Sequence, residues 1–374
     1  MKIVIAMDSF KGTLTACQAC EIVAKAIADC LPDAHLVIKP MADGGEGTAQ
    51  AMLKAAGGKW LPQTVMGPLP DMKVDAGFAL FDPDKTALVE MASASGLELL
   101  PKEKLNPLKT TTFGTGELIK AVLKYKPAKI LLAVGGSATV DGGTGAATAL
   151  GWKFLDHNGN PIPLGGQGLS HITKIVQPEN FALPPVEVLC DVDNPLCGEH
   201  GAAKVYAPQK GATPQMVEQL EKGLRHLAVL VEKQLHRNIK NVPGAGAAGG
   251  LAAGAIAFMN AKLLSGIETV IAHTNICAEL QSADWVITGE GSFDKQSLYG
   301  KVVSGITKIA SQSHTHLAVI AGQVSVSRKQ YQELGIDTAI SCRNNDMSLD
   351  YALKNCRRLL YSAAQHFVEK FLAK

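Results

Sequence analysis

The chain has 374 residues, and its 36 lysine and arginine residues against 34 aspartate and glutamate residues give a formal net charge of +2. Proteins that bind nucleic acids usually carry a clear basic excess, so this balance argues against that class of partner. With 47% hydrophobic and 19% charged residues the chain is expected to fold around packed cores. Its length exceeds the roughly 250–300 residues at which a single core stops growing, so two domains are expected.

The N-terminal apolar run ends at Asp8, which makes it too short for a signal peptide. The Ala- and Gly-rich stretch at 244–259 is too short to span a bilayer. Eight cysteines are scattered along the chain, and the lone pair Cys17 and Cys20 is expected to be two buried helix residues rather than part of a metal or redox site. These features predict a cytoplasmic protein without a membrane partner.

The first elements of the chain predict a β-α-β unit. A β-branched run at 2–6 precedes a helical pattern at 15–31 and a second apolar run at 36–38. The last third of the chain repeats this alternation, with expected strands at 285–287, 317–320 and 338–340 and an expected helix at 301–311. Alternation of this kind implies parallel strands with helical crossovers, so both ends of the chain are expected to build one doubly wound, mostly parallel sheet.

The middle of the chain has a different pattern. Its expected elements are a hairpin with strands at 76–81 and 86–89 and a turn at 82–84, a helix after Gly116, strands at 130–134 and 186–190, an irregular segment at 156–170, and an amphipathic helix at 214–235. We therefore predict a discontinuous doubly wound α/β domain from residues 1–66 and 284–374, with a second α/β domain, residues 67–283, inserted into it. The active site is expected in the cleft between the two domains.

Glycine is the one compositional departure, with 37 residues. Four glycine-rich turns follow expected strands, at 8–12, 42–48, 135–145 and 288–294. Glycine lets backbone amides approach an anion, and the following helix N-terminus adds partial positive charge. One such turn alone is more often explained by turn geometry and helix capping. Four turns at presumed carboxyl ends of strands together favour a nucleotide or phosphate site.

Known phosphate motifs do not explain these turns. The chain has no G-x-x-x-x-G-K-[ST] segment and no H-R-D or D-F-G signature, so neither a P-loop nor a protein kinase is predicted. Residues 244–249 match G-x-G-x-x-G, which keeps an NAD-dependent dehydrogenase open as an alternative. No good buried strand precedes this match, so tight helix packing or a binding loop is favoured there.

Two aspartates follow the expected strand at 186–190. Asp191 and Asp193 would share one side of an extended chain, where they could hold one Mg²⁺ ion or accept a proton from a substrate hydroxyl. An Asx-rich turn closed by Pro195 is the alternative. Lys210 and Lys11 each lie close to a glycine, and each by itself is expected to be a solvated surface charge. Phosphoryl transfer nevertheless uses such carboxylates, lysines and amides together.

Seven segments, taken in order, closely resemble the type I glycerate kinase family. They are residues 8–11 (DSFK), 42–48 (ADGGEGT), 113–119 (FGTGELI), 135–143, 190–195 (CDVDNP), 208–212 (PQKGA) and 288–291 (TGEG). The resemblance runs from the first strand to about residue 345. It implies a two-domain α/β enzyme that transfers the γ-phosphoryl group of ATP to a hydroxyl of D-glycerate, generally the 2-hydroxyl in this family.

With this reading, ATP and Mg²⁺ are the expected cofactors and D-glycerate is the expected small-molecule partner. Asp191 is the predicted base, Lys11 and Asp8 are further catalytic residues, and Asp193 or Asp43 would hold Mg²⁺. The predicted substrate- and phosphate-binding residues are Ser9, Asp43, Gly44, Gly45, Gly135, Gly136, Ser137, Thr139, Lys210, Glu290 and Asp294.

Two departures from the family pattern affect these predictions. Met7 stands where the family usually has proline, and Ser292 stands where it usually has arginine. The missing positive charge would then come from Lys295 or Lys301. A non-enzymatic protein that binds small anions through the same glycine turns is a further alternative, and the sequence is compatible with a homo-oligomer.

Overall fold

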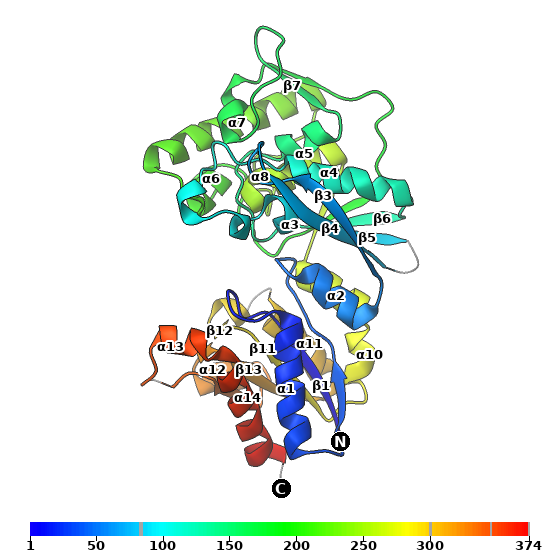
Figure 1. Ribbon diagram of the computed structural model, residues 1–374, viewed down its shortest axis with the longest axis vertical. Coiled ribbons are helices and arrows are strands. Elements are labelled where there is room, and N and C mark those ends of the chain that lie inside the picture. Colours follow the sequence, from blue (N-terminus) through cyan, green and yellow to red (C-terminus); the bar gives the residue numbers. More distant parts are fainter. Residues whose placement is uncertain (82–84, 299–300, 345, 373–374) are drawn as a thin grey trace. The chain divides into compact units, whose positions relative to one another are not determined.

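A computed structural model of the protein describes residues 1–81, 85–298, 301–344 and 346–372, and these fall into two compact units (Figure 1). The first unit comprises Met1–Asp43, Gln50–Gly57 and Ile267–Lys374, and the second comprises Gly44–Ala49 and Gly58–Gly266. Both ends of the chain therefore belong to the first unit. The domain boundaries predicted after residues 66 and 283 stay predictions, while the chain passes between the compact units at 43–44, 49–50, 57–58 and 266–267.

The first unit is built on a five-stranded sheet in the order β15-β13-β11-β1-β2, and every neighbouring pair in it is parallel. Its strands are β1 (Lys2–Met7), β2 (His35–Ile38), β11 (Trp285–Gly289), β13 (His316–Ala321) and β15 (Thr338–Ser341). The prediction that strands from both ends of the chain share one parallel sheet is confirmed.

Helices cover both faces of this sheet. Alternate β1 residues Ile3, Ile5 and Met7 pack in one core with α1 (Ala16–Cys30) and α14 (Cys356–Phe367). From β1 to β2 the chain moves toward one edge of the sheet, and from β11 to β13 it moves toward the other edge. Because such crossovers are right-handed, α11 (Val302–Ser313) covers the other face. The remaining helices of this unit are α9 (Gly266–Thr274), which begins at the last residue of the second unit, α10 (Ile276–Leu280), α12 (Arg328–Glu333) and α13 (Leu349–Lys354). Two short strands, β12 (Ser292–Phe293) and β14 (Gln323–Val324), pair with each other.

The second unit has a six-stranded mixed sheet in the order β10-β9-β6-β5-β4-β3. Its strands are β3 (Lys59–Met66), β4 (Lys73–Phe81), β5 (Thr86–Glu90), β6 (Lys129–Ala133), β9 (Val186–Leu189) and β10 (Lys262–Leu264). The predicted hairpin is confirmed as the antiparallel pair β4 and β5, whereas its turn at 82–84 lies outside the described residues. No strand was predicted at β3, which contains Pro62, a residue that sheets tolerate at an edge such as this one.

One helix of the second unit corrects the sequence prediction. The helix predicted after Gly116 is α4 (Phe113–Val122), which begins before both Gly114 and Gly116 and contains them. A Cβ atom at Gly116 would lie 2.3 Å from the Ala146 carbonyl oxygen, so glycine is needed where α4 packs against α5 (Thr144–Ala149). The other helices are α2 (Thr48–Ala56, which continues into the first unit), α3 (Ala92–Ser95), α6 (Ala202–Tyr206), α7 (Pro214–Leu235) and α8 (Ala247–Met259), and β7 (Lys153–Leu155) pairs with β8 (Lys174–Val176).

Candidate functional site

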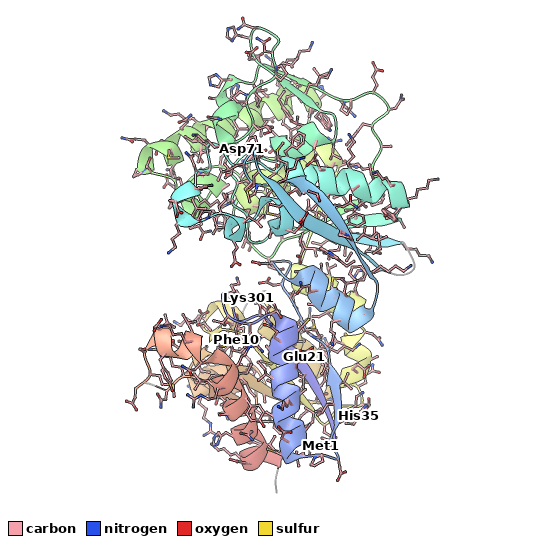
Figure 2. The ribbon with its side chains drawn as sticks, in the orientation of Figure 1. Met1, Phe10, Glu21, His35, Asp71 and Lys301 are labelled. Atoms are coloured by element: carbon pink, nitrogen blue, oxygen red, sulfur yellow. The ribbon has the colours of Figure 1, made fainter. Side chains whose placement is uncertain are left out.

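The first unit contains a pocket of about 340 Å³ beside the turns that follow β1, β11 and β13. These turns lie at the carboxyl ends of parallel strands, where open α/β sheets bind their ligands. Phe10 and Lys301, which come from opposite ends of the chain, both contribute to this end of the unit (Figure 2). The predicted site residues that line the pocket are Asp8, Ser9, Lys11, Asp43, Glu290 and Asp294.

Asp8 is the most perturbed carboxyl group of this pocket. Its side chain is buried directly after β1, and its Oδ1 atom accepts a hydrogen bond of 2.6 Å from the Ser9 amide. Burial, together with the neighbouring carboxylates of Asp43 and Glu290, raises the pKa of Asp8 to about 8. The carboxylates therefore lie close enough for their charges to repel one another, so a bound cation would be favourable.

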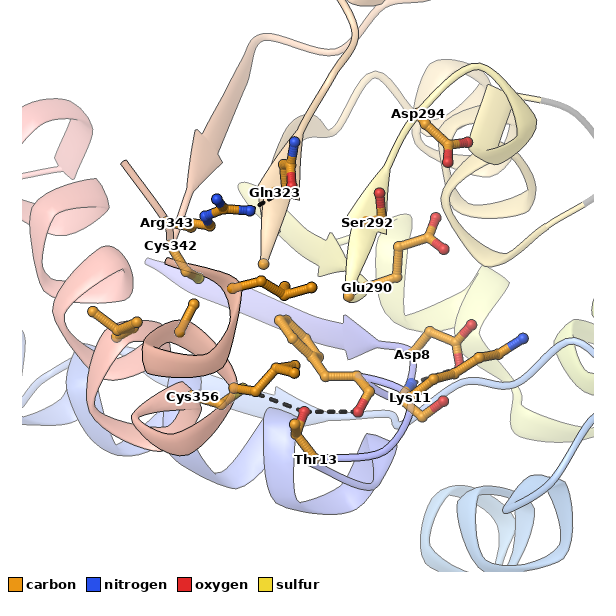
Figure 3. A pocket seen from close by; sticks show the side chains of 18 of the residues that line it. Asp8, Lys11, Thr13, Glu290, Ser292, Asp294, Gln323, Cys342, Arg343 and Cys356 are labelled. Carbon is orange, nitrogen blue, oxygen red and sulfur yellow. Dashed lines mark hydrogen bonds between the residues drawn. The ribbon is translucent and has the colours of Figure 1, made fainter. Parts of the chain in front are cut away.

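Glu290 is a second buried carboxylate of this pocket, and one of its oxygen atoms lacks a hydrogen-bond partner among the described residues. It follows β11, and Figure 3 shows it on the same side of the pocket as Asp8 and Lys11. Its Oε1 atom is buried and has no hydrogen-bond partner among the described residues, and burial raises the pKa of its carboxyl group. A buried acceptor without a partner is costly, so this oxygen is suited to accept a hydrogen bond from a ligand or to bind a metal ion.

These carboxylates fit Mg²⁺ as a cofactor, because Mg²⁺ prefers oxygen donors and is usually held by one or two carboxylates together with substrate phosphates. In the described part of the chain, no group of three or more His, Cys, Asp or Glu residues is placed to hold a metal ion by itself. Lys301 also lines the pocket, whereas Lys295 is exposed and is not one of the lining residues.

Lys210 is the most unusual cation of the second unit. Its side chain is only 2% exposed, and its Nζ atom donates hydrogen bonds to Ser137 Oγ at 2.6 Å and to the Thr139 carbonyl oxygen at 2.8 Å. Burial lowers the pKa of Lys210 to about 7, against an opposing effect of Asp141. The expectation of a solvated surface lysine is wrong here, because residues 208–210 form a 3₁₀ turn that carries the side chain inward.

The turn at 135–145 is held by a residue that the sequence did not single out. Asp141 is fully buried, and its carboxylate accepts hydrogen bonds from the amides of Thr112 (2.8 Å), Gly143 (3.1 Å) and Gly145 (3.3 Å). These amides are therefore occupied by the chain itself. The only sequence signal for this role was an acidic residue inside a Gly-rich turn, which is a common pattern.

Within the second unit, the structure brings the glycines of the predicted turn at 42–48 together with the predicted turn at 135–145. The Gly135 amide donates to the Gly44 carbonyl oxygen at 3.3 Å, and a Cβ atom on Gly135 would lie 2.5 Å from the Gly45 Cα atom. Gly136 has a φ angle of 75°, which glycine adopts without strain. Glycine at these positions thus serves close backbone packing as well as any ligand.

A buried carboxylate also occupies the start of α2. Glu90, at the end of β5, accepts a hydrogen bond of 2.7 Å from the Ala49 amide. Burial raises the pKa of Glu90 to about 7, although the amide of Ala49 opposes this shift. The first turn of this helix therefore holds a carboxylate from the protein, and Glu90 is a structural residue that the sequence did not reveal.

The two aspartates after β9 have different environments. Asp191 Oδ1 accepts hydrogen bonds of 2.9 Å from both Ser265 Oγ and the Gly266 amide at the start of α9. Asp193 is exposed. The structure therefore gives Asp191 a defined orientation in the second unit, while a Mg²⁺ role for Asp193 stays a prediction.

The G-x-G-x-x-G match at 244–249 forms a packing turn. Ala248, Gly249 and Gly250 all have positive φ angles, and the Gly249 carbonyl oxygen accepts a hydrogen bond of 3.0 Å from the Gly142 amide. A Cβ atom on Gly249 would lie 1.9 Å from the Thr139 carbonyl oxygen. These glycines therefore pack the segment against the 139–143 turn, which agrees with tight packing, one of the two interpretations that the sequence favours.

The comparisons with known proteins identify the family. A family model described as the glycerate kinase family matches residues 3–372. The chain belongs to the glycerate kinase family. Among its relatives, a glycerate kinase of Halalkalibacterium halodurans is 46% identical and covers 97% of this chain and 96% of its own length. A glycerate 2-kinase of Escherichia coli is 43% identical and covers 95% of this chain and 93% of its own length.

A solved structure confirms the α/β fold of this glycerate kinase family member. The crystal structure of a Salmonella typhimurium protein, assigned as a glycerate kinase 2, superposes with a TM-score of 0.84 at 40% identity, and the match covers 100% of this chain and 98% of the other. This family member is thus an enzyme of the kinase class. Among its described residues, no helix combines the length and apolar character needed to cross a membrane.

Proposed function

We propose that this enzyme transfers the γ-phosphoryl group of ATP to the 2-hydroxyl of D-glycerate, giving 2-phosphoglycerate and ADP. Membership of the glycerate kinase family supports the reaction type. The choice of the 2-hydroxyl rests on the Escherichia coli relative that is named a glycerate 2-kinase. In the reaction, the bond from the γ-phosphorus to the β,γ-bridging oxygen breaks, ADP leaves with that oxygen, and the substrate hydroxyl oxygen bonds to the phosphorus.

The observation that carries the proposal is the group of carboxylates in the pocket of the first unit, of which Asp8 and Glu290 are buried. Asp8 has a pKa of about 8, Asp43 lies beside it, and Glu290 has a buried oxygen without a partner in the described structure. Asp8 and Asp43 would hold Mg²⁺, which when bound would neutralise charge on the phosphates of ATP. Lys11 and Lys301 would contribute positive charge from the chain itself.

The second unit would supply the remaining groups. Asp191 would accept the proton of the substrate hydroxyl as phosphorus bonds to the oxygen. Its hydrogen bonds from Ser265 and Gly266 fix the carboxylate in one orientation, which favours a positioned base. Lys210, Ser137 and Thr139 would bind anionic oxygens, because Lys210 already brings a cation to a cluster in which the Thr139 hydroxyl is buried and has no partner among the described residues.

A coupled assay for ADP release with D-glycerate and Mg·ATP tests the reaction, and ³¹P NMR of the product identifies the phosphorylated hydroxyl. For Asp191→Asn we expect kcat to fall by about 10²–10⁴-fold, the usual contribution of a general base, with KM little changed. The exposed Asp71→Asn is the matched control in the same unit. ATP binding without glycerate-dependent ADP release would refute the proposal, and wild-type kcat in Asp191→Asn would remove that residue as the base.

A further inference from the structure

The pocket of the first unit has a second, apolar wall opposite its carboxylates. Leu349, Ala352 and Leu353 of α13 line this wall, together with Cys356 and Leu359 of α14. The three α13 residues are spaced i, i+3 and i+4, so they share one face of the helix. Figure 3 shows Cys356 and Cys342 on one side of the pocket and Glu290, Asp8 and Lys11 on the other. The pocket is therefore polar at one end and apolar at the other.

The part of this wall that Leu349, Ala352 and Leu353 form, the α13 wall, is largely exposed to solvent. Leu349 is 58% exposed and Leu353 is 49% exposed, and α13 buries none of its six side chains. A helix this short is marginal in water, and most helices in proteins are stabilised by burial of an apolar face. Two large exposed side chains facing a concave pocket, on a helix that buries nothing else, indicate a surface that a ligand covers.

The chemistry of the two ends decides which ligand fits. D-glycerate has only three carbons. One is the carboxylate carbon and the other two each bear a hydroxyl, so the molecule has no apolar face to place against two leucines. A nucleoside triphosphate has a planar base with apolar faces at one end and anionic phosphates at the other. Its two ends match the leucine wall and the end with Lys11, Lys301 and the candidate Mg²⁺ carboxylates.

We infer that the α13 wall is the nucleobase subsite of the phosphoryl donor, with Leu349 and Leu353 packing against the base. This inference rests on the proposed function, because it takes ATP as the donor. Polar groups for the edge of the base lie at the same end of the pocket. The Arg343 guanidinium donates from Nη1 to Gln323 Oε1 at 3.3 Å and from Nε to the Met347 carbonyl oxygen at 2.8 Å. These contacts hold Arg343 and Gln323 in place where both line the pocket.

Substitutions on the exposed helix test the subsite without disturbing a core. We expect Leu349→Ser and Leu353→Ser each to weaken Mg·ADP binding, measured by calorimetry, by about tenfold, because each removes apolar surface that the base would bury. The KM for ATP is expected to rise in parallel while the KM for D-glycerate stays unchanged. Inorganic tripolyphosphate, which has no base, is expected to bind the wild type and both variants equally.

Leu334→Ser is the matched control, because Leu334 is 43% exposed in the same unit and is not one of the residues that line the pocket. It is expected to bind Mg·ADP like the wild type. If both α13 variants bind Mg·ADP as tightly as the wild type, the subsite is refuted while the kinase activity stands. A rise in the KM for D-glycerate alone also overturns it. If the wild type neither binds Mg·ADP nor turns over ATP, the proposed function and the subsite fail together.

Discussion

Lys210 Nζ lies 2.6 Å from Ser137 Oγ in the interior of the second unit, where the lysine side chain is almost completely enclosed. A charged ammonium group is costly to bury, and burial lowers the pKa of Lys210 to about 7. Its protonation therefore changes near neutral pH rather than near 10. An anionic ligand next to it would favour the charged form, so binding of such a ligand would be linked to uptake of a proton.

Lys210→Arg tests this linkage through the pH dependence of activity. If the free enzyme must carry a charged Lys210 to bind its anionic substrate, kcat/KM for the wild type is expected to fall as pH rises above about 7. Arginine stays charged throughout this range, so the fall is expected to disappear in the variant even if its maximal activity is lower. Lys222→Arg, an exposed change in α7, is expected to keep the wild-type profile. A Lys210→Arg enzyme with the same fall above pH 7 would contradict the assignment.

Glu90 links the stability of the folded protein to pH. Its pKa is about 7 in the folded protein and near 4.5 in the unfolded chain, so between these values the folded state binds more protons. The free energy of unfolding is therefore expected to fall as pH rises from about 4.5 to 7. Glu90→Gln keeps an acceptor for the Ala49 amide but cannot ionise, so urea midpoints measured from pH 5 to 8 are expected to vary less. The exposed Glu103→Gln is expected to keep the wild-type slope, and an unchanged slope in Glu90→Gln would count against this explanation.

The elements that the sequence predicted well are those that its local pattern determines. The strands at 285–287 and 317–320 are short apolar runs, and the structure extends each of them by two residues as β11 and β13. The helix at 214–235 begins at Pro214 after Thr213, whose hydroxyl accepts a hydrogen bond from the Met216 amide. Such capping signals are read within a few residues of sequence, so these boundaries could be predicted.

The parts of the candidate site that were missed depend on contacts between distant residues. Ser137 and Lys210 are 73 positions apart, and only the fold shows that the lysine is buried. Asp141 and Thr112 are 29 positions apart, so the carboxylate could not be recognised as the support of the α4 start. The Mg²⁺ role of Asp193 stays a prediction, because its side chain is exposed and its spacing from Asp191 does not by itself show that the two residues share a site.

Asp141 is expected to be essential for the stability of the second unit. Asp141→Ala would leave the buried Thr112 amide and hydroxyl and the Gly143 amide without their acceptor, at distances that are now 2.8, 2.9 and 3.1 Å. We expect a loss of about 3 kcal/mol or more in the free energy of unfolding, the usual result of removing one partner from a buried charged network. Urea unfolding measures it. The control Asp71→Ala removes an exposed carboxylate and is expected to change the midpoint little, whereas equal effects of the two changes would show that the Asp141 contacts are not important for stability.

Gly249 gives a test of the packing interpretation of the 244–249 segment. Gly249→Ala would place a Cβ atom 1.9 Å from the Thr139 carbonyl oxygen, and its φ angle of 63° adds the strain of a left-handed residue. Gly159→Ala is the matched control, because Gly159 has a φ angle of 83° but no atom within 4 Å of the added Cβ. The control therefore isolates the backbone cost, about 1–2 kcal/mol, which both variants share.

We expect Gly249→Ala to lose several kcal/mol more in the free energy of unfolding than the control and to reduce activity, since the displaced carbonyl oxygen of Thr139 is the one that accepts a hydrogen bond from Lys210. Equal unfolding midpoints for the two variants would show that the segment can move away from the 139–143 turn, which would reopen the interpretation of 244–249 as a binding loop.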